Sequence, residues 1–184
     1  MSGGILIAGV GNVFKGDDAF GVEVVQCLAR RSLPPGVRVV DFGIRGIDLT
    51  YALMDGYRAA MLVDTVQRGE QPGTIYVIEP ECLSGEEPDA GELLITPHDL
   101  DPAKVLRLVK TLGGSCGRIL LIGCEPETFG DEEEGLMGLS PRVAVAVNEA
   151  VDLIERLVGQ LLKEPGPGTW RSSGRDDAIG GMRQ

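Results

Sequence analysis

The stretch GVGNVFKGDDAFG, residues 9–21, decides the fold that we expect for this chain. It follows the short apolar run ILIA, residues 5–8, and precedes apolar residues at helical spacing. A strand, a glycine-rich turn and a helix in this order are typical of the first unit of an α/β domain. The turn also carries two adjacent aspartates, Asp17 and Asp18, and negative charge is unfavourable where a nucleotide phosphate would bind.

The turn matches the dinucleotide-binding pattern GxGxxG only in part. Gly9 and Gly11 occupy the first two glycine positions, but the third is Phe14. A nucleotide-binding role therefore stays open as an alternative. A simpler interpretation is a tight turn in which Asp17 or Asp18 caps the following helix, where a carboxylate suits the helix dipole. Two aspartates in a row suggest a different role for the second.

Beyond this unit, predicted strands and helices alternate along the chain. Strands are expected over residues 5–10, 37–42, 59–63, 73–79 and 118–123, with a further extended segment over 92–96. Helices are expected from Asp17 or Asp18, over 46–54, from Pro102 to about Gly113, and from Pro141 onward. This alternation predicts a three-layer α/β/α sandwich with a mostly parallel five-stranded sheet.

Composition narrows the class of protein. The chain has 184 residues, of which 43% are hydrophobic and 24% charged, so we expect one folded domain over 1–163 and a disordered tail over 164–184. The formal net charge of −11 argues against a nucleic-acid or anionic-membrane partner. We find no secretory signal and no membrane-spanning run, and the four cysteines form no CxxC pair, so we expect a cytoplasmic protein with free thiols.

Three polar positions follow predicted extended segments and are the candidate site. The first is the pair Asp17–Asp18 after the first strand, of which the second aspartate is the candidate ligand. The others are Asp64 after the apolar run Met61–Val63, and His98, which is the only histidine. The carboxyl ends of parallel strands are where α/β sheets bind ligands. Two carboxylates and an imidazole suit a borderline cation such as zinc or nickel. Structural roles remain open, because Asp64 could cap a turn and His98 could be a helix-entry residue.

No nucleophile motif stands out, and the sequence contains no GxSxG. A cysteine–histidine pair could combine Cys124 with His98, since Cys124 also ends a predicted strand. The neighbouring residues of Cys124 offer no activating partner. A small residue that fills the edge of the core is the favoured interpretation.

Six motifs together resemble the hydrogenase maturation proteases in order and spacing, over roughly residues 4–160. They are GVGNVFKGDDAFG at 9–21, DFGIRGIDL at 41–49, VDT at 63–65, TPH at 96–98, LIGCEPE at 121–127 and GLSPRV at 138–143. The resemblance implies an endopeptidase that removes a short C-terminal peptide from the large-subunit precursor of a nickel–iron hydrogenase after nickel insertion.

The resemblance also implies which residues act. The metal-binding and catalytic positions of the family fall on Asp18, Asp64 and His98, where Asp18 replaces a frequent Glu. Nickel would arrive with the precursor, no organic cofactor is implied, and either the metal or a carboxylate would activate water. Arg45 departs from the usual Gly-Gly-Thr segment, which bears on the identity of the partner hydrogenase. A nucleotide-binding regulator and a non-catalytic metal-binding chaperone remain alternatives.

Overall fold

The computed structural model describes residues 3–79, 102–113, 117–131 and 135–164 of the chain. Its strands are β1 (Ile5–Val10), β2 (Val37–Gly43), β3 (Ala59–Thr65), β4 (Ile75–Ile78) and β5 (Arg118–Cys124). Its helices are the 3₁₀ turn η1 (Gly16–Ala19), α1 (Phe20–Leu28), α2 (Gly46–Leu53), α3 (Pro102–Thr111) and α4 (Pro141–Leu161). These bounds confirm the predicted elements that fall within the described residues, apart from the start of the first helix.

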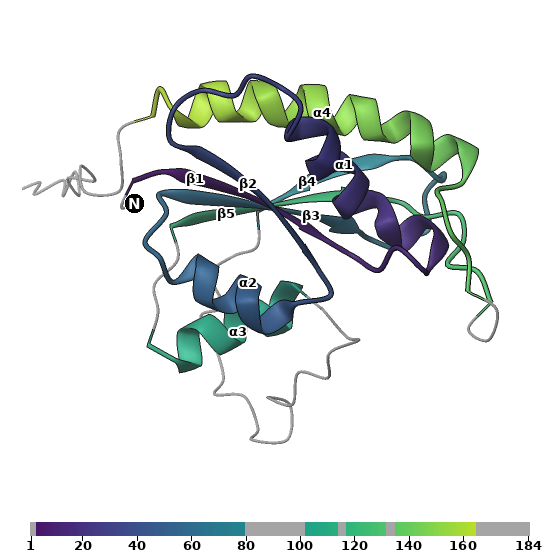
Figure 1. Ribbon diagram of the computed structural model, residues 1–184, viewed down its shortest axis with the longest axis horizontal. Helices are drawn as coiled ribbons and strands as arrows, with labels where there is room; N and C mark the ends of the chain where they lie inside the picture. Colours follow the sequence, from purple (N-terminus) through teal and green to yellow (C-terminus); the bar gives the residue numbers. More distant parts are fainter. Residues whose placement is uncertain (1–2, 80–101, 114–116, 132–134, 165–184) are drawn as a thin grey trace, which may run out of the picture.

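The strands form one five-stranded sheet in the order β2-β1-β3-β5-β4. All neighbouring pairs are parallel except β4 with β5. Helices α1 and α4 cover one face of the sheet, and α2 and α3 cover the other (Figure 1). The predicted three-layer α/β/α sandwich with a mostly parallel sheet is therefore confirmed.

Strand β1 shows how the sequence builds both cores. All six of its residues are buried. Ile5 and Ile7 pack toward α1 and α4, whereas Leu6, Ala8 and Val10 pack toward α2 and α3. A strand that is covered on both faces needs a continuous apolar run rather than an alternating one. Within the described parts of the chain, no helix is both long and apolar enough to cross a membrane.

The first helix does not begin at Asp17 or Asp18. The chain makes the 3₁₀ turn η1 first, and α1 begins at Phe20 with Ala19 as its N-cap residue. No side-chain hydrogen bond caps either element, so the predicted capping role of the aspartates is wrong. The donors to Asp17 lie between β5 and α4, and the donors to Asp18 are Asn12 of the same turn and Thr65 of β3. The predicted extended segment 92–96, His98 and nearly all of the predicted tail lie outside the described residues.

Chain direction across the sheet reverses between β1 and β3. From β1 the chain crosses to β2 through α1 on one face, and it then returns past β1 to β3 through α2 on the other face. The loops that follow β1 and β3 therefore diverge, and such a point opens a crevice at the carboxyl ends of the strands. The turn after β1 carries Asp18 and the last residues of β3 carry Asp64 to this position.

Candidate active site

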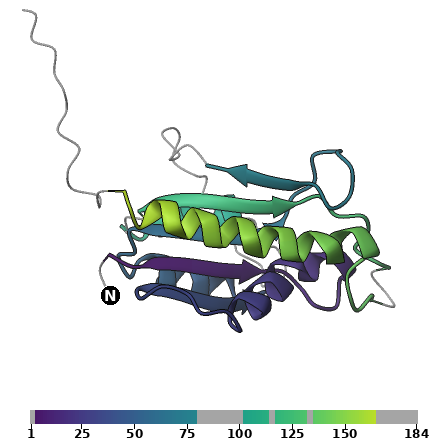
Figure 2. The same ribbon diagram turned by 90° about the horizontal axis from the view of Figure 1, so that it is seen from above.

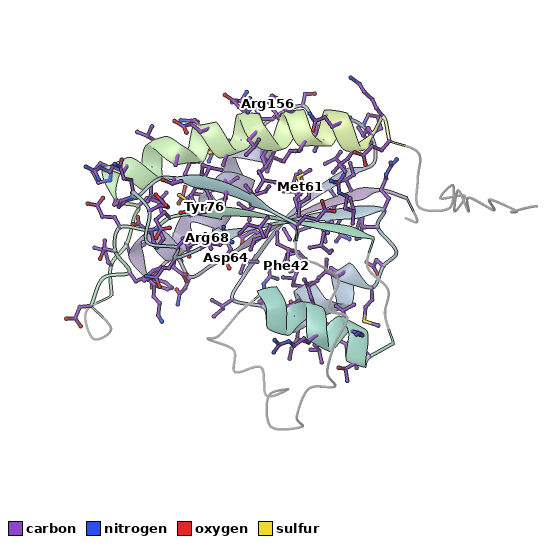
Figure 3. All side chains as sticks on the ribbon, turned by 180° about the vertical axis from the view of Figure 1, so that it is seen from behind. Phe42, Met61, Asp64, Arg68, Tyr76 and Arg156 are labelled. Carbon is purple, nitrogen blue, oxygen red and sulfur yellow. The ribbon has the colours of Figure 1, made fainter. Side chains whose placement is uncertain are left out.

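Asp64 lies inside β3, one residue before the strand ends. It pairs with Gly123 of β5 and is only 7% exposed, so it is more buried than a residue just past a strand end would be. Its Oδ1 atom accepts a hydrogen bond from the backbone N–H of Thr65, with an N···O distance of 2.7 Å. Figure 3 shows Asp64 at the same end of the sheet as Arg68 and Tyr76. The carboxylate is thus held at the carboxyl edge of β3.

Asp18 comes to the same edge from the turn after β1. Its Oδ2 atom accepts a hydrogen bond from the backbone N–H of Asn12 at 2.8 Å. Its Oδ1 atom accepts one from the hydroxyl of Thr65 at 3.4 Å. Thr65 therefore contacts both candidate carboxylates, through its backbone N–H to Asp64 and its hydroxyl to Asp18. Thr65 was not among the predicted site residues, although it directly follows Asp64 and belongs to the motif VDT at 63–65.

The shape of the turn depends on glycine at residue 11. Gly11 has φ +136°, a conformation that favours glycine. A Cβ atom there would lie 1.8 Å from the carbonyl oxygen of Asp18. Asn12 braces the turn locally, because its Oδ1 atom accepts the backbone N–H of Phe14 at 3.0 Å. The backbone N–H of Gly11 also donates to the carbonyl of Gly43 at 3.0 Å, which joins the turns after β1 and β2.

Asp17, the neighbour of Asp18, points into the protein and is fully buried. Its carboxylate accepts three backbone N–H groups, from Glu127 at 2.7 Å, Thr128 at 2.9 Å and Ser140 at 2.6 Å. Ser140 is the N-cap residue of α4. Asp17 thereby fastens the turn after β1 to the segment between β5 and α4. The two aspartates have separate roles, because only Asp18 faces the candidate site.

Arg45 lies beside the site but folds back on its own turn. Its guanidinium donates to the backbone carbonyls of Asp41 and Phe42 and approaches the carboxylate of Asp48 at 3.6 Å. These contacts close the turn between β2 and α2, where Gly43 has φ +52°. Arg45 therefore shapes this turn, which the hydrogen bond from Gly11 joins to the candidate site.

A third buried carboxylate, Glu125, lies after β5 and supports the neighbouring loop. It accepts the backbone N–H groups of Arg68 and Gly69 and the hydroxyl of Tyr76, which is 2.6 Å away. The Tyr76 hydrogen bond lowers the pKa of Glu125 below its ordinary value, and the two N–H groups add to this effect. Burial and the Glu125 carboxylate together raise the pKa of Tyr76 to about 12. Because all of these donors belong to the fold itself, Glu125 is a structural residue.

Cys124 is fully buried at the end of β5. Burial, together with the negative charge of Asp17, raises the pKa of the Cys124 thiol to about 12. A thiol that stays protonated at neutral pH is a poor nucleophile. The interpretation of Cys124 as a small core residue therefore agrees with the structure better than a cysteine–histidine pair does.

The structure thus brings Asp18 and Asp64 together, whereas His98 lies outside the residues that it describes. Among the described residues, no three or more His, Cys, Asp or Glu side chains form a group that could hold a metal ion. The two carboxylates supply oxygen ligands, and a third protein ligand would have to come from elsewhere in the chain. Their place at a switch point of a parallel α/β sheet is the place of an enzyme active site in this class of fold.

Comparison with known proteins identifies the family. The family model for hydrogenase maturation proteases matches residues 22–157. A putative hydrogenase maturation protease of Methanocaldococcus jannaschii is 34% identical over 160 residues, covering 86% of this chain and 97% of the relative. The hydrogenase 2 maturation protease of Escherichia coli is 30% identical over 151 residues, covering 82% of this chain and 87% of the relative.

Solved structures agree with this. The crystal structure of a hydrogenase 2 maturation peptidase from Thaumarchaeota archaeon SCGC_AB-539-E09 superposes with a TM-score of 0.63 at 31% identity, covering 85% of this chain and 98% of that one. The fold is that of an α/β protein with two carboxylates at the carboxyl edge of its sheet. The chain belongs to the hydrogenase maturation protease family, and it is an endopeptidase of the hydrolase class.

Proposed function

We propose that this maturation protease removes a short C-terminal peptide from the large-subunit precursor of a nickel–iron hydrogenase. We further propose that it recognises the nickel that the precursor already carries. The convergence of Asp18 and Asp64 on Thr65 at the switch point supports this most directly. Sharing one cation requires oxygens of the two carboxylates to lie within about 4 Å of each other when it binds, given metal–ligand bonds of about 2 Å.

In this proposal nickel is part of the substrate. Asp18 and Asp64 offer carboxylate oxygens and His98 offers an imidazole nitrogen, a mixed set that suits a borderline divalent cation. Three protein ligands leave coordination positions for the groups that hold nickel in the precursor. The free protease is therefore expected to bind nickel weakly. Docking onto the metal would place the scissile peptide bond beside the carboxylates.

Hydrolysis then consumes one water molecule. Its oxygen adds to the scissile carbonyl carbon, the C–N bond breaks, and a proton passes to the departing amine. Either the nickel acts as a Lewis acid on the carbonyl, or a carboxylate of the site takes a proton from the water. Both routes use the residues at the Asp18–Asp64 edge. Cleavage depends on prior nickel insertion in both, because docking onto the nickel places the scissile bond.

The test uses a hydrogenase large-subunit precursor from the same organism, prepared with and without nickel. Electrophoresis that resolves the loss of a short peptide should show cleavage of the nickel-loaded form only. Asp18→Ala, Asp64→Ala and His98→Ala should each abolish cleavage. Asp152→Ala is the matched control, because it removes an exposed carboxylate on α4, and it should cleave at the normal rate.

The possible outcomes separate the alternatives. Equal cleavage of the nickel-free precursor would overturn the metal recognition. Full activity of the His98→Ala variant would overturn the ligand set, because the chain has no second histidine. A precursor that binds but keeps its full length would favour a non-catalytic metal-binding chaperone.

A further inference from the structure

Three large apolar side chains are exposed on two segments that meet beside the candidate site. Phe14, in the turn after β1, is 62% exposed, and Leu136 and Met137, shortly before α4, are 39% and 74% exposed. We refer to Phe14, Leu136 and Met137 as the apolar tip. Single exposed apolar residues are common on protein surfaces, but a group of them beside a site calls for an explanation.

Backbone hydrogen bonds hold the two segments of the tip side by side. The N–H of Leu136 donates to the carbonyl of Phe14 at 2.9 Å, and the N–H of Gly16 donates to the carbonyl of Leu136 at 2.7 Å. Lys15 and Leu136 thus form a parallel bridge. Figure 2 shows the turn after β1 and the segment leading to α4 at the same end of the sheet. The tip is therefore one surface built from two distant parts of the sequence.

The fold also fixes the shape of the tip. Asp17 ties both segments together through Thr128 and Ser140. Gly130 has φ +74°, and a Cβ atom there would lie 2.4 Å from the Cβ atom of Leu136. Such a surface can bind a partner without losing much conformational freedom.

The tip continues directly into the candidate site. Phe14 is hydrogen-bonded to Asn12, and the N–H of Asn12 holds the carboxylate of Asp18. Phe14 and Asn12 are two residues apart, so their Cα atoms lie at most about 7 Å from each other. An extended polypeptide advances about 3.3 Å per residue, so a substrate bound at Asp18 reaches the tip within a few residues of the cleaved bond. The substrate polypeptide is therefore the partner that lies within reach of the tip.

We propose that the apolar tip binds apolar side chains of the hydrogenase precursor within a few residues of the cleaved bond. This inference rests on the proposed function and adds a contact that contributes affinity rather than bond cleavage. Aromatic and methionine side chains are enriched at the centres of protein interfaces, which agrees with Phe14 and Met137 at the tip. The chain's net charge of −11 further favours precursor surfaces that are basic around the apolar contact.

The test is the double variant Phe14→Ser/Met137→Ser, assayed on the nickel-loaded precursor. KM should rise about tenfold or more, because two apolar contacts are lost. The value of kcat should stay within about twofold, because neither residue touches the reacting bond. Leu112→Ser is the matched control, since Leu112 is a comparably exposed apolar residue at the end of α3. Thermal unfolding of both variants should match that of the original chain.

A direct binding titration keeps the two proposals separate. Unchanged KM and unchanged affinity in the double variant would overturn the role of the tip and leave the protease proposal intact. A fall in kcat with unchanged KM would also overturn it. If the original chain binds the precursor without cutting it, the proposed function fails, while weaker binding by the double variant would still support the tip.

Discussion

The backbone N–H of Asn12 donates a hydrogen bond to Oδ2 of Asp18 at 2.8 Å, within the turn that follows β1. In a nucleotide-binding turn the backbone N–H groups at this place point to a phosphate. Here an internal carboxylate takes up the donor and adds negative charge at the same point. The strand–turn–helix unit of a nucleotide-binding fold therefore presents a carboxylate rather than an anion-binding nest.

This relationship predicts that the protein does not bind nucleotides. Isothermal titration calorimetry with ATP or NAD⁺ should show no binding at nucleotide concentrations up to about 1 mM. Any binding free energy would then be weaker than roughly 4 kcal/mol. A dissociation constant in the micromolar range would contradict the prediction and revive the nucleotide-binding alternative. Nickel-loaded precursor is the positive control for a correctly folded sample.

Gly11→Ala should disrupt the site, because the added Cβ atom would lie 1.8 Å from the carbonyl oxygen of Asp18. Gly56→Ala is the matched control, since Gly56 also has a positive φ but has open space around its Cβ position. We expect Gly56→Ala to cost about 1 kcal/mol of unfolding free energy from backbone strain alone. Gly11→Ala should cost clearly more and should abolish processing, as urea unfolding and the cleavage assay would show. Equal effects of the two substitutions would contradict this.

Asp17→Ala should destabilise the fold strongly. The substitution leaves the backbone N–H groups of Glu127, Thr128 and Ser140 without their acceptor. Three such losses cost about 3 kcal/mol or more. In a protein of this size that lowers the melting temperature by roughly 6–12 °C. Glu127→Ala removes an exposed side chain but keeps its N–H group, so its melting temperature should stay nearly unchanged. A small effect of Asp17→Ala would contradict this role of its three hydrogen bonds.

The stability of the protein should depend on pH through Glu125. Its pKa is lowered in the folded state, chiefly by the hydroxyl of Tyr76, from the usual value of about 4.3 in an unfolded chain. The stabilisation is therefore fully present above that value and is lost as the pH falls through the lower folded-state pKa. Urea midpoints should show Glu125→Gln less stable than the original chain at neutral pH, with the difference shrinking in acid.

Glu149→Gln, on the exposed side of α4, is the control for Glu125→Gln. It removes one carboxylate without removing the contacts of Glu125, so its stability difference should be small at every pH. A constant difference for Glu125→Gln across the acid range would show that its charge plays no part.

Cys124→Ala should keep proteolytic activity. The thiol is buried, and its pKa of about 12 keeps it protonated at neutral pH. Iodoacetamide should leave Cys124 unmodified in the native protein, as mass spectrometry of the digested product would show, and should modify it after denaturation. Loss of cleavage in a well-folded Cys124→Ala variant would instead indicate a thiol peptidase.

Local sequence patterns predicted most of the architecture. The apolar runs at residues 5–8 and 61–63 are buried strands, and the rule that sites lie at strand ends points to the Asp17–Asp18 pair and to Asp64 from the sequence alone. Pro72 and Gly73 are typical turn residues, and the structure has a turn there: Gly73 has φ +87°, and the N–H of Thr74 donates to the carbonyl of Gln71. These patterns involve residues that are close together in the sequence, so they can be recognised without knowing the fold.

Contacts between distant segments could not be predicted in this way. The capping prediction for Asp17 relied on the neighbouring helix. The three donors to the Asp17 carboxylate instead belong to the segment that follows β5 in the sequence. Thr65 contacts Asp18 only because β1 and β3 are adjacent in the sheet. The role of His98 stays a prediction, since it falls outside the described residues.

The three hydrogen bonds that the Asp17 carboxylate accepts have a consequence for how the protein folds. Their acceptor is near the start of the chain, whereas their donors lie 110, 111 and 123 residues later. Contacts over such long sequence separations form late, because closing the chain between them costs entropy that other contacts must first offset. The first turn to be synthesised is thus among the last to take its final form. The turn after β1 can take its final form only after the start of α4 has been synthesised, because Ser140 donates to Asp17. The active site is therefore complete only when almost the whole domain has been made.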